Sequence, residues 1–410
     1  MKRGLKKACI ALFLILTLVG TAGLGCAGGE EGKTTIVIGN LTDLTGVAAA
    51  ALEPMTWALE DVVRDINERE PIPGVKLEVV NYDTAFNPAR FLTGYDYLKG
   101  KGAEVIICVF NDASETLKPY AAEDKIALLG MATSVPMVDP AGWVFAFSAP
   151  TRWSIKSMLQ WVSDDWDYPA KGRKPTLATV GWNDNWGQDN ARGAEEFCRD
   201  NPDLFEYEGT FLSPVGYTGP WSGDIAKTRN VDYINVAANG ALMPATFWKE
   251  YRDAGGTGTN IDTEAQSAYV GFITDKCGWD YLDGKLNVQC WGWWNLGWPE
   301  TEYIKGLLNK YRPDDAAEVM KAGMGYLGGG AMQRFALDIV LAAIEEAGAE
   351  DFDGQAFYDT AITYMEDWAG SQRGFTATRR HAVDDCCVLK WTAADEDLEL
   401  ISDIWVPLIY

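Results

Sequence analysis

The sequence predicts an α/β protein of two doubly wound lobes, each built around a parallel β-sheet. Short apolar runs rich in β-branched residues alternate with segments of helical periodicity, as strands buried on both faces alternate with crossover helices. The alternation starts at Thr35 and restarts at Thr176, after a polar, proline-containing break. The length of 410 residues also exceeds that of one typical domain.

The first series of elements has the order βαβαβαβ, which requires a parallel sheet with right-handed crossovers. Helices are expected to begin at Pro54 and Pro88, after Asn111, and at Thr151. The expected strands are the apolar runs at 35–41, 76–82, 104–110, 126–129 and 144–147.

The second series repeats the alternation and predicts the second lobe. Its expected strands are 176–182, 206–212, 233–237 and 269–273, and its expected helices are 189–199, 224–229 and 243–251. The remaining elements are a strand at 287–291, helices at 300–311, 325–347 and 354–365, and hairpin strands at 377–391 and 398–407.

Two neighbouring strands of the first lobe end in small hydroxylic residues. Asp112 and Ser114 follow the third strand, and Ala132 and Thr133 follow the fourth. In open α/β sheets ligands bind at the carboxyl ends of the strands, where helix N-termini offer free N–H groups to an anion. These residues therefore predict a site for a small acidic group, unless Ser114 and Thr133 only cap helices and turns.

Charge and residue usage exclude several classes of function. The net charge is −24 and no long basic run occurs, which argues against a nucleic-acid partner. The chain has one histidine, His381, which we expect to be exposed, and a single histidine leaves no histidine-rich zinc site. Gly328–Gly330 lacks the Lys-Ser/Thr that completes a phosphate loop.

Acidic pairs and tryptophans leave alternatives open. Asp184 with Asp189 matches glycosidase carboxylates or a calcium site, but no calcium-loop spacing is present and an acidic surface explains the pair more simply. The chain has 17 tryptophans. Those at 291–298 are expected to pack in the core, to wall an apolar ligand, or to meet a membrane partner.

The first 26 residues form an expected export signal, followed by a polar tether at 27–33. A basic start at 1–7 precedes an apolar stretch, and Gly23-Leu24-Gly25-Cys26 resembles a bacterial lipoprotein cleavage box. Cys26 is then the lipidated residue that attaches the protein to the membrane. The alternative is an uncleaved anchor, because the run 8–27 is about long enough to span a bilayer.

An exported protein is able to form disulfides, and six cysteines follow the signal. Cys277 and Cys290 flank a turn-rich segment and are the favoured pair. Adjacent Cys386 and Cys387 cannot bridge each other without strain.

The chain resembles the type I periplasmic solute-binding proteins, in the Leu/Ile/Val-binding branch that serves ABC transporters. The resemblance covers residues 34–410 and depends on the order and spacing of short motifs. These are Ile36–Gly39 through Thr45-Gly46, Asp65-Ile66-Asn67, Pro73–Leu77 to Tyr82-Asp83, Ser114 to Tyr120, Met131–Ser134, Asn185-Trp186-Gly187 and Gly374-Phe375 to Arg380-His381.

This resemblance implies two Rossmann-like lobes around a cleft, joined by three hinge crossings near Ala149, Asp280 and Ala369. The first lobe would comprise 34–149 with 281–368, and the second 150–280 with 369–410. It further implies a monomeric binding protein without cofactor or metal. Such a protein delivers a small amphiphilic ligand, an amino acid or a small apolar or aromatic carboxylate, to an ABC permease. The alternatives are a ligand-sensing receptor domain and a cleft hydrolase.

The resemblance also assigns roles to residues. Ser114, Ala132 and Thr133 would hold a ligand carboxylate, and Trp186 would lie at the cleft. The position of the family's ammonium-binding tyrosine falls at Asn239 here, which removes that contact. Either Asp275 holds the ammonium instead, or the ligand has no ammonium group.

Overall fold

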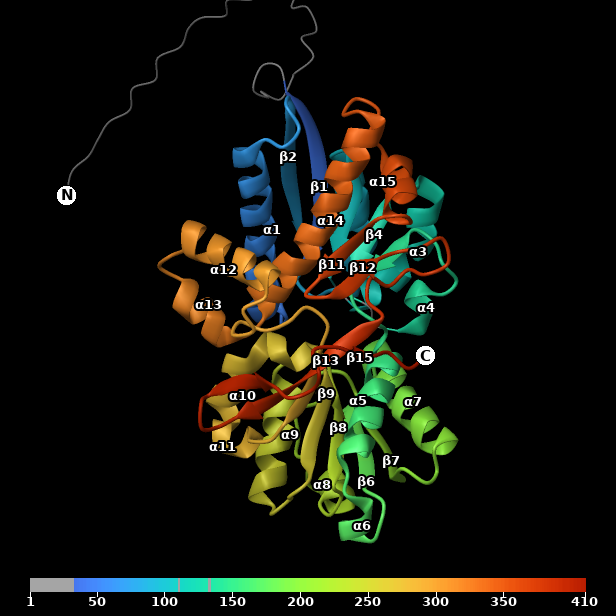
Figure 1. Ribbon diagram of the computed structural model, residues 1–410, viewed down its shortest axis with the longest axis vertical. Coiled ribbons are helices and arrows are strands. Elements are labelled where there is room, and N and C mark those ends of the chain that lie inside the picture. The colour runs from blue at the N-terminus through green and yellow to red at the C-terminus, as the bar shows by residue number, and fades with distance from the viewer. Residues whose placement is uncertain (1–32, 110, 132–133) are drawn as a thin grey trace, which may run out of the picture. The chain divides into compact units, whose positions relative to one another are not determined.

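The computed structural model describes residues 33–109, 111–131 and 134–410 (Figure 1). Thr34–Tyr410 forms a compact unit that contains both lobes. The expected lipidation site, Cys26, lies outside the described residues, as do Ala132 and Thr133.

The first lobe contains a five-stranded parallel sheet in the order β2-β1-β3-β4-β5. Its inner strands are apolar and buried because helices cover the sheet, whereas the edge strand β2 is mostly half-buried. The strands are β1 (Thr34–Thr42), β2 (Val75–Asp83), β3 (Ala103–Cys108), β4 (Ala127–Gly130) and β5 (Val144–Ala146). The helical segments are α1 (Ala49–Arg69), η1 (Pro88–Arg90), α2 (Phe91–Gly100), α3 (Asn111–Asp124) and α4 (Val135–Val138), and later α12 (Pro299–Tyr311), α13 (Ala316–Ala322), α14 (Gly325–Ala347) and α15 (Gly354–Ala361).

The second lobe contains an eight-stranded mixed sheet, with the path β14-β13-β10-β9-β8-β6-β7 and β15 beside β13. The strands are β6 (Thr176–Trp182), β7 (Glu206–Ser213), β8 (Tyr233–Ala237), β9 (Thr259–Thr263), β10 (Leu286–Gln289), β13 (Asp385–Thr392), β14 (Asp397–Leu400) and β15 (Val406–Pro407). The helical segments are α5 (Thr151–Asp165), α6 (Tyr168–Lys171), α7 (Asn185–Asp200), α8 (Ser222–Thr228), α9 (Leu242–Asp253), η2 (Ala265–Tyr269), α10 (Val270–Cys277) and α11 (Trp279–Leu282). β6 to β10 are parallel, whereas β13 to β15 pair antiparallel. The sheet is therefore mixed, although a parallel sheet was predicted.

The strand pairings show which segments near the crossings belong to each sheet. β10 pairs with β9 and β13, so residues 286–289 belong to the second sheet although 281–368 is expected in the first lobe. The returning segment 380–382 runs beside β5, where Ala146 N–H donates to Arg380 O (2.6 Å) and Ala382 N–H donates to Ala146 O (2.8 Å). A separate hairpin, β11 (Met365–Trp368) with β12 (Ser371–Gly374), lies between α15 and this segment.

Helix α14 begins and ends where the sequence predicts, and it packs against α1. Its glycines permit close helix packing, because a Cβ on Gly329 would lie 2.7 Å from Met55 Cγ. By length and composition it is the one helix of the described residues that could cross a membrane, and 78% of its most apolar window is buried inside the protein.

The predicted strand at 269–273 is wrong. Tyr269 ends the short helix η2, and residues 270–277 form α10, which buries Val270 and Ile273 at helical spacing. The strand of this region is β9, which the sequence does not predict because its residues, TNIDT, are mostly polar. Asp262 of β9 is buried only because it forms an ion pair with buried Lys285.

Two predictions about burial and pairing are also wrong. His381 is only 4% exposed, with Nδ1 2.9 Å from Val383 O and its ring packed edge-on against Trp153. Burial lowers the pKa of His381 to about 4. Cys277 and Cys290 are separate buried thiols. Cys277 instead donates to Ile273 O within α10 (3.1 Å).

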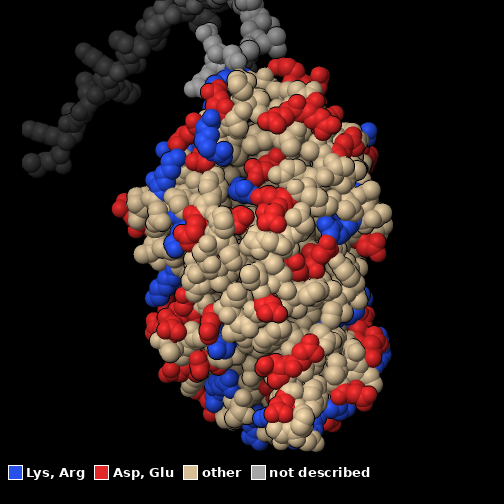
Figure 2. Space-filling model, in the orientation of Figure 1, with Lys and Arg blue, Asp and Glu red and all other residues tan. Residues whose placement is uncertain are grey.

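Tryptophans 291, 293, 294 and 298 are all buried, at no more than 8% exposure, so this cluster packs in the core, although Trp293 and Trp294 also line a pocket. Figure 2 shows acidic side chains spread over the visible face with basic ones between them. This distribution agrees with the net charge of −24 and shows no continuous basic patch on that face of the described residues.

Candidate ligand site at the junction of the lobes

The N-termini of α3 and α7 meet where the two lobes join. α3 follows β3 of the first sheet and α7 follows β6 of the second, so both helices start at the carboxyl end of a parallel strand. Asn185 Nδ2 of α7 donates to Glu115 Oε2 of α3 (2.8 Å). Ser134 Oγ donates to Glu115 Oε1, so both carboxylate oxygens of Glu115 are fixed. The link between Glu115 and Asn185 is a direct polar contact between the two lobes.

Three carboxyl groups gather at this junction with raised pKa values. Burial raises the pKa of Asp112 and of Glu115, and it raises the pKa of Asp184 to about 6. The charge of Asp112 adds to the shifts of Glu115 and Asp184, so Asp112 repels both of the other carboxylates. A positively charged group placed among them would relieve this repulsion.

Neighbouring basic residues are already engaged. Arg152 Nη2 forms an ion pair with Asp189 Oδ1 (2.8 Å), and the backbone N–H of Arg152 donates to Asp189 Oδ2 (3.2 Å). Lys118 Nζ donates to Pro136 O (2.9 Å), and burial lowers its pKa. The negative charge of Asp112 and Asp184 therefore has no ion-pair partner among the described residues.

The two aspartates differ in their hydrogen bonds. Asp184 is the N-cap of α7, and its side chain accepts from Gly187 N–H (2.7 Å). Asp112 lies in the first turn of α3, and its buried Oδ1 has no hydrogen-bond partner among the described residues. A buried acceptor without a donor is costly, so Asp112 Oδ1 is an open position for a donor from a ligand.

The residues predicted from sequence fall partly at this junction. Ser114 is fully buried beside Asp112, and its hydroxyl donates to Cys108 O at the end of β3 (3.3 Å). Trp186 follows Asn185 in the first turn of α7 and is 2% exposed, and its carbonyl accepts from Thr151 Oγ1 (3.3 Å). The structure thus brings Asp112, Ser114 and Trp186 to one region.

Two other predicted residues have different surroundings. Asn239 lies half-buried in the loop after β8. Asp275 is on the exposed side of α10, with 72% of its side chain accessible, and forms a long ion pair with Lys321 of α13 (4.0 Å). Ala132 and Thr133 lie outside the described residues.

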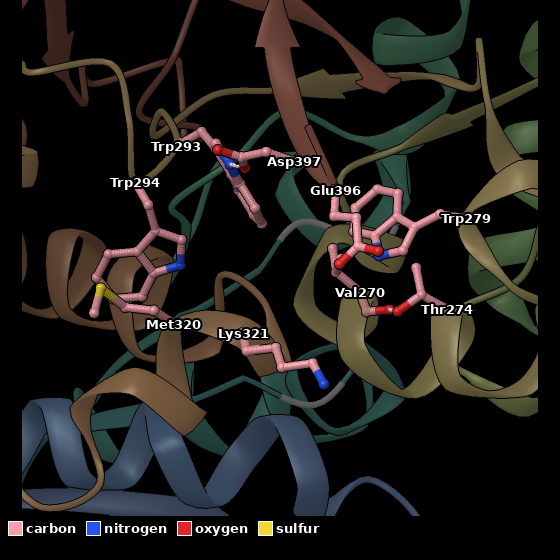
Figure 3. A pocket seen from close by; sticks show the side chains of 9 residues that line it. All are labelled: Val270, Thr274, Trp279, Trp293, Trp294, Met320, Lys321, Glu396 and Asp397. Atoms are coloured by element: carbon pink, nitrogen blue, oxygen red, sulfur yellow. Dashed lines mark hydrogen bonds between the residues drawn. The ribbon is translucent and has the colours of Figure 1, made fainter. Parts of the chain in front are cut away.

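A separate pocket of about 270 Å³ lies beside α10 and α13 (Figure 3). Trp293 Nε1 donates to Asp397 Oδ1 (2.7 Å) and Trp294 Nε1 donates to Gly323 O (3.0 Å), so both indoles are fixed by hydrogen bonds. The lining residues are Val270, Thr274, Trp279, Trp293, Trp294, Met320, Lys321, Glu396 and Asp397. Trp293 and Trp294 belong to the tryptophans that were candidates to wall an apolar ligand, whereas Asp112, Ser114, Trp186, Asn239 and Asp275 do not line this pocket.

Sequence reasoning missed Glu115 and treated Asp184 as a surface acid. Glu115 directly follows Ser114, but an acid near the N-terminus of a helix usually serves only the helix dipole. The available signal was the coincidence of acids at 112, 115 and 184 after strands of both lobes. Each sequence position alone is ordinary, and only the meeting of the lobes gives them a common environment.

Comparison with known proteins identifies the family. A family model described as a periplasmic binding protein matches residues 35–396. The chain belongs to the periplasmic binding protein family. A comparison with curated proteins finds no match.

Solved structures show the same type I fold at low sequence identity. A branched-chain amino acid ABC transporter protein from Thermus thermophilus with bound valine has a TM-score of 0.78 and 16% identity, over 91% of this chain and 96% of that one. A fatty acid ABC transporter substrate-binding protein from Thermomonospora curvata has a TM-score of 0.75 and 17% identity, over 92% of this chain and 95% of that one. A solute-binding protein from R. palustris in complex with 4-hydroxybenzoate has a TM-score of 0.74 and 16% identity, over 91% of this chain and 97% of that one.

Proposed function

We propose that the protein is the extracytoplasmic solute-binding component of an ABC transporter, which closes its two lobes on a small solute and delivers it to a membrane permease. The observation that carries this proposal is the contact of α3 with α7 at the carboxyl ends of both sheets, including the hydrogen bond from Asn185 to Glu115. A ligand that touches both helices favours the closed form, because it gains contacts that the open form lacks. This mechanism requires no nucleophile.

The acidic junction supports a solute with a cationic group. An α-amino acid would place its ammonium near Asp112 Oδ1 and Asp184, which have no ion-pair partner among the described residues. Its carboxylate would take the anion position expected at Ser114, Ala132 and Thr133. A carboxylate without an ammonium would instead add to the negative charge. We therefore rank amino acids above plain carboxylates.

Three solutes with one side chain test this ranking on the full chain. Leucine carries both charged groups, 4-methylpentanoate only the carboxylate, and 3-methylbutylamine only the ammonium. Phenylalanine, 3-phenylpropanoate and phenethylamine form the matched aromatic set. Thermal-shift screening followed by calorimetric titration is expected to show the tightest saturable binding for an amino acid, without turnover. Equal or tighter binding of the carboxylates would contradict the ammonium site, and absence of binding by any small solute would contradict the function.

A variant pair places the ammonium contact. Asp112→Asn removes a charged acceptor and is expected to weaken the amino acid about 10- to 100-fold, the scale of a hydrogen bond to a charged group. Glu123→Gln makes the same chemical change at an exposed position of α3 and is the control. Equal affinities in both variants would contradict the contact with Asp112.

Membrane attachment through lipidated Cys26 and a monomeric state complete the proposal. Replacement of Cys26 by alanine is expected to release the protein from the membrane fraction. Retention of the variant in that fraction would support the uncleaved anchor instead.

A further inference from the structure

Cys290, directly after β10, and Cys386 of β13 lie at the position where the antiparallel register of these two strands would continue by one residue in the second lobe. The register pairs Leu286 with Lys390 and continues to Gln289 with Cys387. One further step along this register places Cys290, directly after β10, across from Cys386 of β13. Both side chains are fully buried, and both are separate thiols in the structure, as is Cys277.

The hydrogen bonds identify this position as a non-hydrogen-bonded pair. Val388 directs both backbone groups away from β10, because its N–H donates to Ser402 Oγ (2.9 Å) and its carbonyl accepts from Ile401 N–H (3.1 Å). Pair types alternate along an antiparallel ladder, so the pair two residues beyond Val288 and Val388 has the same type. Such pairs have Cα atoms about 4.5 Å apart, within the range of about 4.4–6.8 Å that a disulfide requires.

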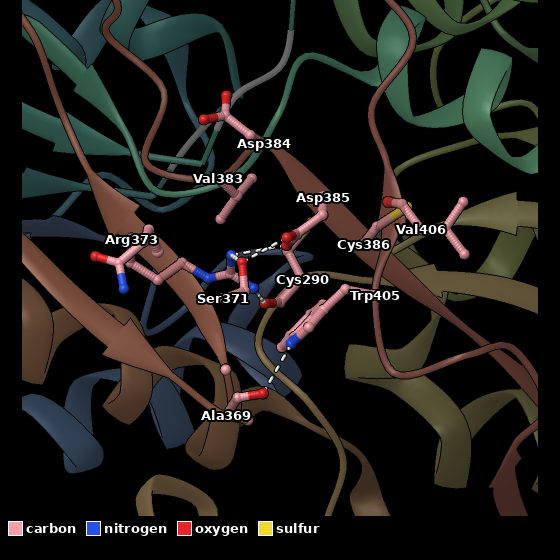
Figure 4. Close-up of polar contacts among 12 residues, drawn as sticks. Cys290, Ala369, Ser371, Arg373, Val383, Asp384, Asp385, Cys386, Trp405 and Val406 are labelled. Atoms are coloured by element: carbon pink, nitrogen blue, oxygen red, sulfur yellow. Dashed lines mark hydrogen bonds and ion pairs between the residues drawn. The ribbon is translucent and has the colours of Figure 1, made fainter.

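The backbone of Cys290 agrees with this assignment. Its N–H donates to Glu264 Oε1 (2.8 Å), and its carbonyl accepts from Arg373 Nη2 (3.1 Å), so neither group bonds to β13. The same guanidinium binds Asp385 Oδ1 through Nη1 (2.8 Å), so one buried arginine joins the backbone of Cys290 to the residue before Cys386 (Figure 4). Arg373 thereby holds the ends of the two strands together.

Cys386, and not its neighbour, faces Cys290. Adjacent residues of a strand point to opposite faces of a sheet, so Cys387 opposes Gln289 and lies on the other face. Cys386 Sγ donates to Val406 O on the β15 side (3.7 Å), so a bond to Cys290 requires Cys386 to give up this contact. The pairing differs from the sequence-based expectation of Cys277 with Cys290.

We infer that Cys290 and Cys386 form a disulfide when the protein folds in an oxidising extracytoplasmic compartment. The bond would join the point where the chain leaves the second sheet to the point where it returns, and so connect two crossings between the lobes. The inference rests on the exported location in the proposed function. It does not depend on the ligand.

The chemistry is thiol–disulfide exchange with a disulfide oxidant, represented in vitro by oxidised glutathione. The thiolate of one cysteine attacks the glutathione disulfide and releases one glutathione thiol. The second cysteine thiolate then attacks the mixed disulfide, which forms the S–S bond and releases the second glutathione. Two protein thiols are oxidised and one glutathione disulfide is reduced to two thiols. Burial raises the pKa of both protein thiols well above the ordinary value, so exchange is favoured before the chain is fully packed.

Peptide mapping of the full chain tests this inference. The protein is refolded in a glutathione redox buffer, denatured without reductant, alkylated and digested with trypsin. We expect residues 286–305 to be recovered linked to residues 381–390, with two fewer alkylated thiols than in the reduced protein. Linkage of 286–305 to 277–285, or full alkylation of all thiols, would overturn the inference.

Two serine variants distinguish the adjacent cysteines. Cys387→Ser leaves Cys386 as the one cysteine of its peptide and is expected to retain the link, whereas Cys386→Ser is expected to abolish it. Loss of the link in Cys387→Ser with retention in Cys386→Ser would refute the pairing. Solute binding is measured on the same samples, so a protein that binds solute without the bond contradicts this inference alone.

Discussion

Asp184 provides the sharpest test of the electrostatics at the lobe junction. Burial and the charge of Asp112 raise its pKa from 3.8 to about 6. One pKa unit corresponds to about 1.4 kcal/mol, so ionised Asp184 costs the folded state at most about 3 kcal/mol. Asn also caps helices well, so Asp184→Asn removes the charge and keeps the cap of α7.

The size of the effect depends on pH. Above pH 6 Asp184 is charged in both folded and unfolded chains, and the folded state carries the full cost. Below pH 3.8 the carboxyl group is protonated in both states and the cost disappears. The stability gained in Asp184→Asn should therefore rise from near zero at pH 3.5 to about 3 kcal/mol at pH 8.

Urea unfolding of the full chain from pH 3.5 to 8 measures this difference, with the exposed Asp203→Asn as the control. A gain that is constant across this range would refute the raised pKa. Titration calorimetry in two buffers of different ionisation enthalpy adds a functional readout. A bound ammonium favours the charged carboxylate, so binding at pH 6 should release up to about half a proton, and almost none at pH 8. Equal release in Asp184→Asn would contradict a role for Asp184 in binding.

Three further predictions follow from other buried or bridging groups. Lys285→Met should destabilise the protein by about 3–5 kcal/mol in chemical denaturation, because it leaves the buried charge of Asp262 unpaired. The double variant with Asp262→Leu should recover most of that loss, and an equal loss in the double variant would contradict this. Glu115→Ala and Asn185→Ala should each weaken solute binding, and their effects on the binding free energy should be less than additive in a calorimetric double-mutant cycle. Full additivity would mean that their hydrogen bond does not contribute to binding. The wild type should lose up to about 3 kcal/mol of stability between pH 6.5 and 4, because burial of the neutral ring lowers the pKa of His381 to about 4, and His381→Gln should not show this loss. Matching pH profiles of the two proteins would refute this.

Elements with strong hydrophobic periodicity were predictable from the sequence. The apolar runs of the first sheet and the long helix α14 follow simple patterns, and the structure places them as expected. β9 was not predictable, because Asp262 is compatible with a buried strand only when Lys285, more than twenty residues later, neutralises it. No local window contains that information.

The candidate site shows the same division. The topology of a parallel sheet places Asp112 and Ser114 at a carboxyl edge from sequence alone. The role of Glu115 depends on Asn185 from the other lobe, and the raised pKa of Asp184 depends on the charge of Asp112. Such pairings arise only when the lobes meet, so sequence order does not reveal them.

Hydrogen exchange with and without saturating solute tests the central claim most directly. If the two lobes close on the solute, amides at the N-termini of both α3 and α7, at 112–118 and 185–191, should become protected together. Protection in one lobe alone, or confined to the pocket lined by Trp293 and Trp294, would contradict capture between the lobes.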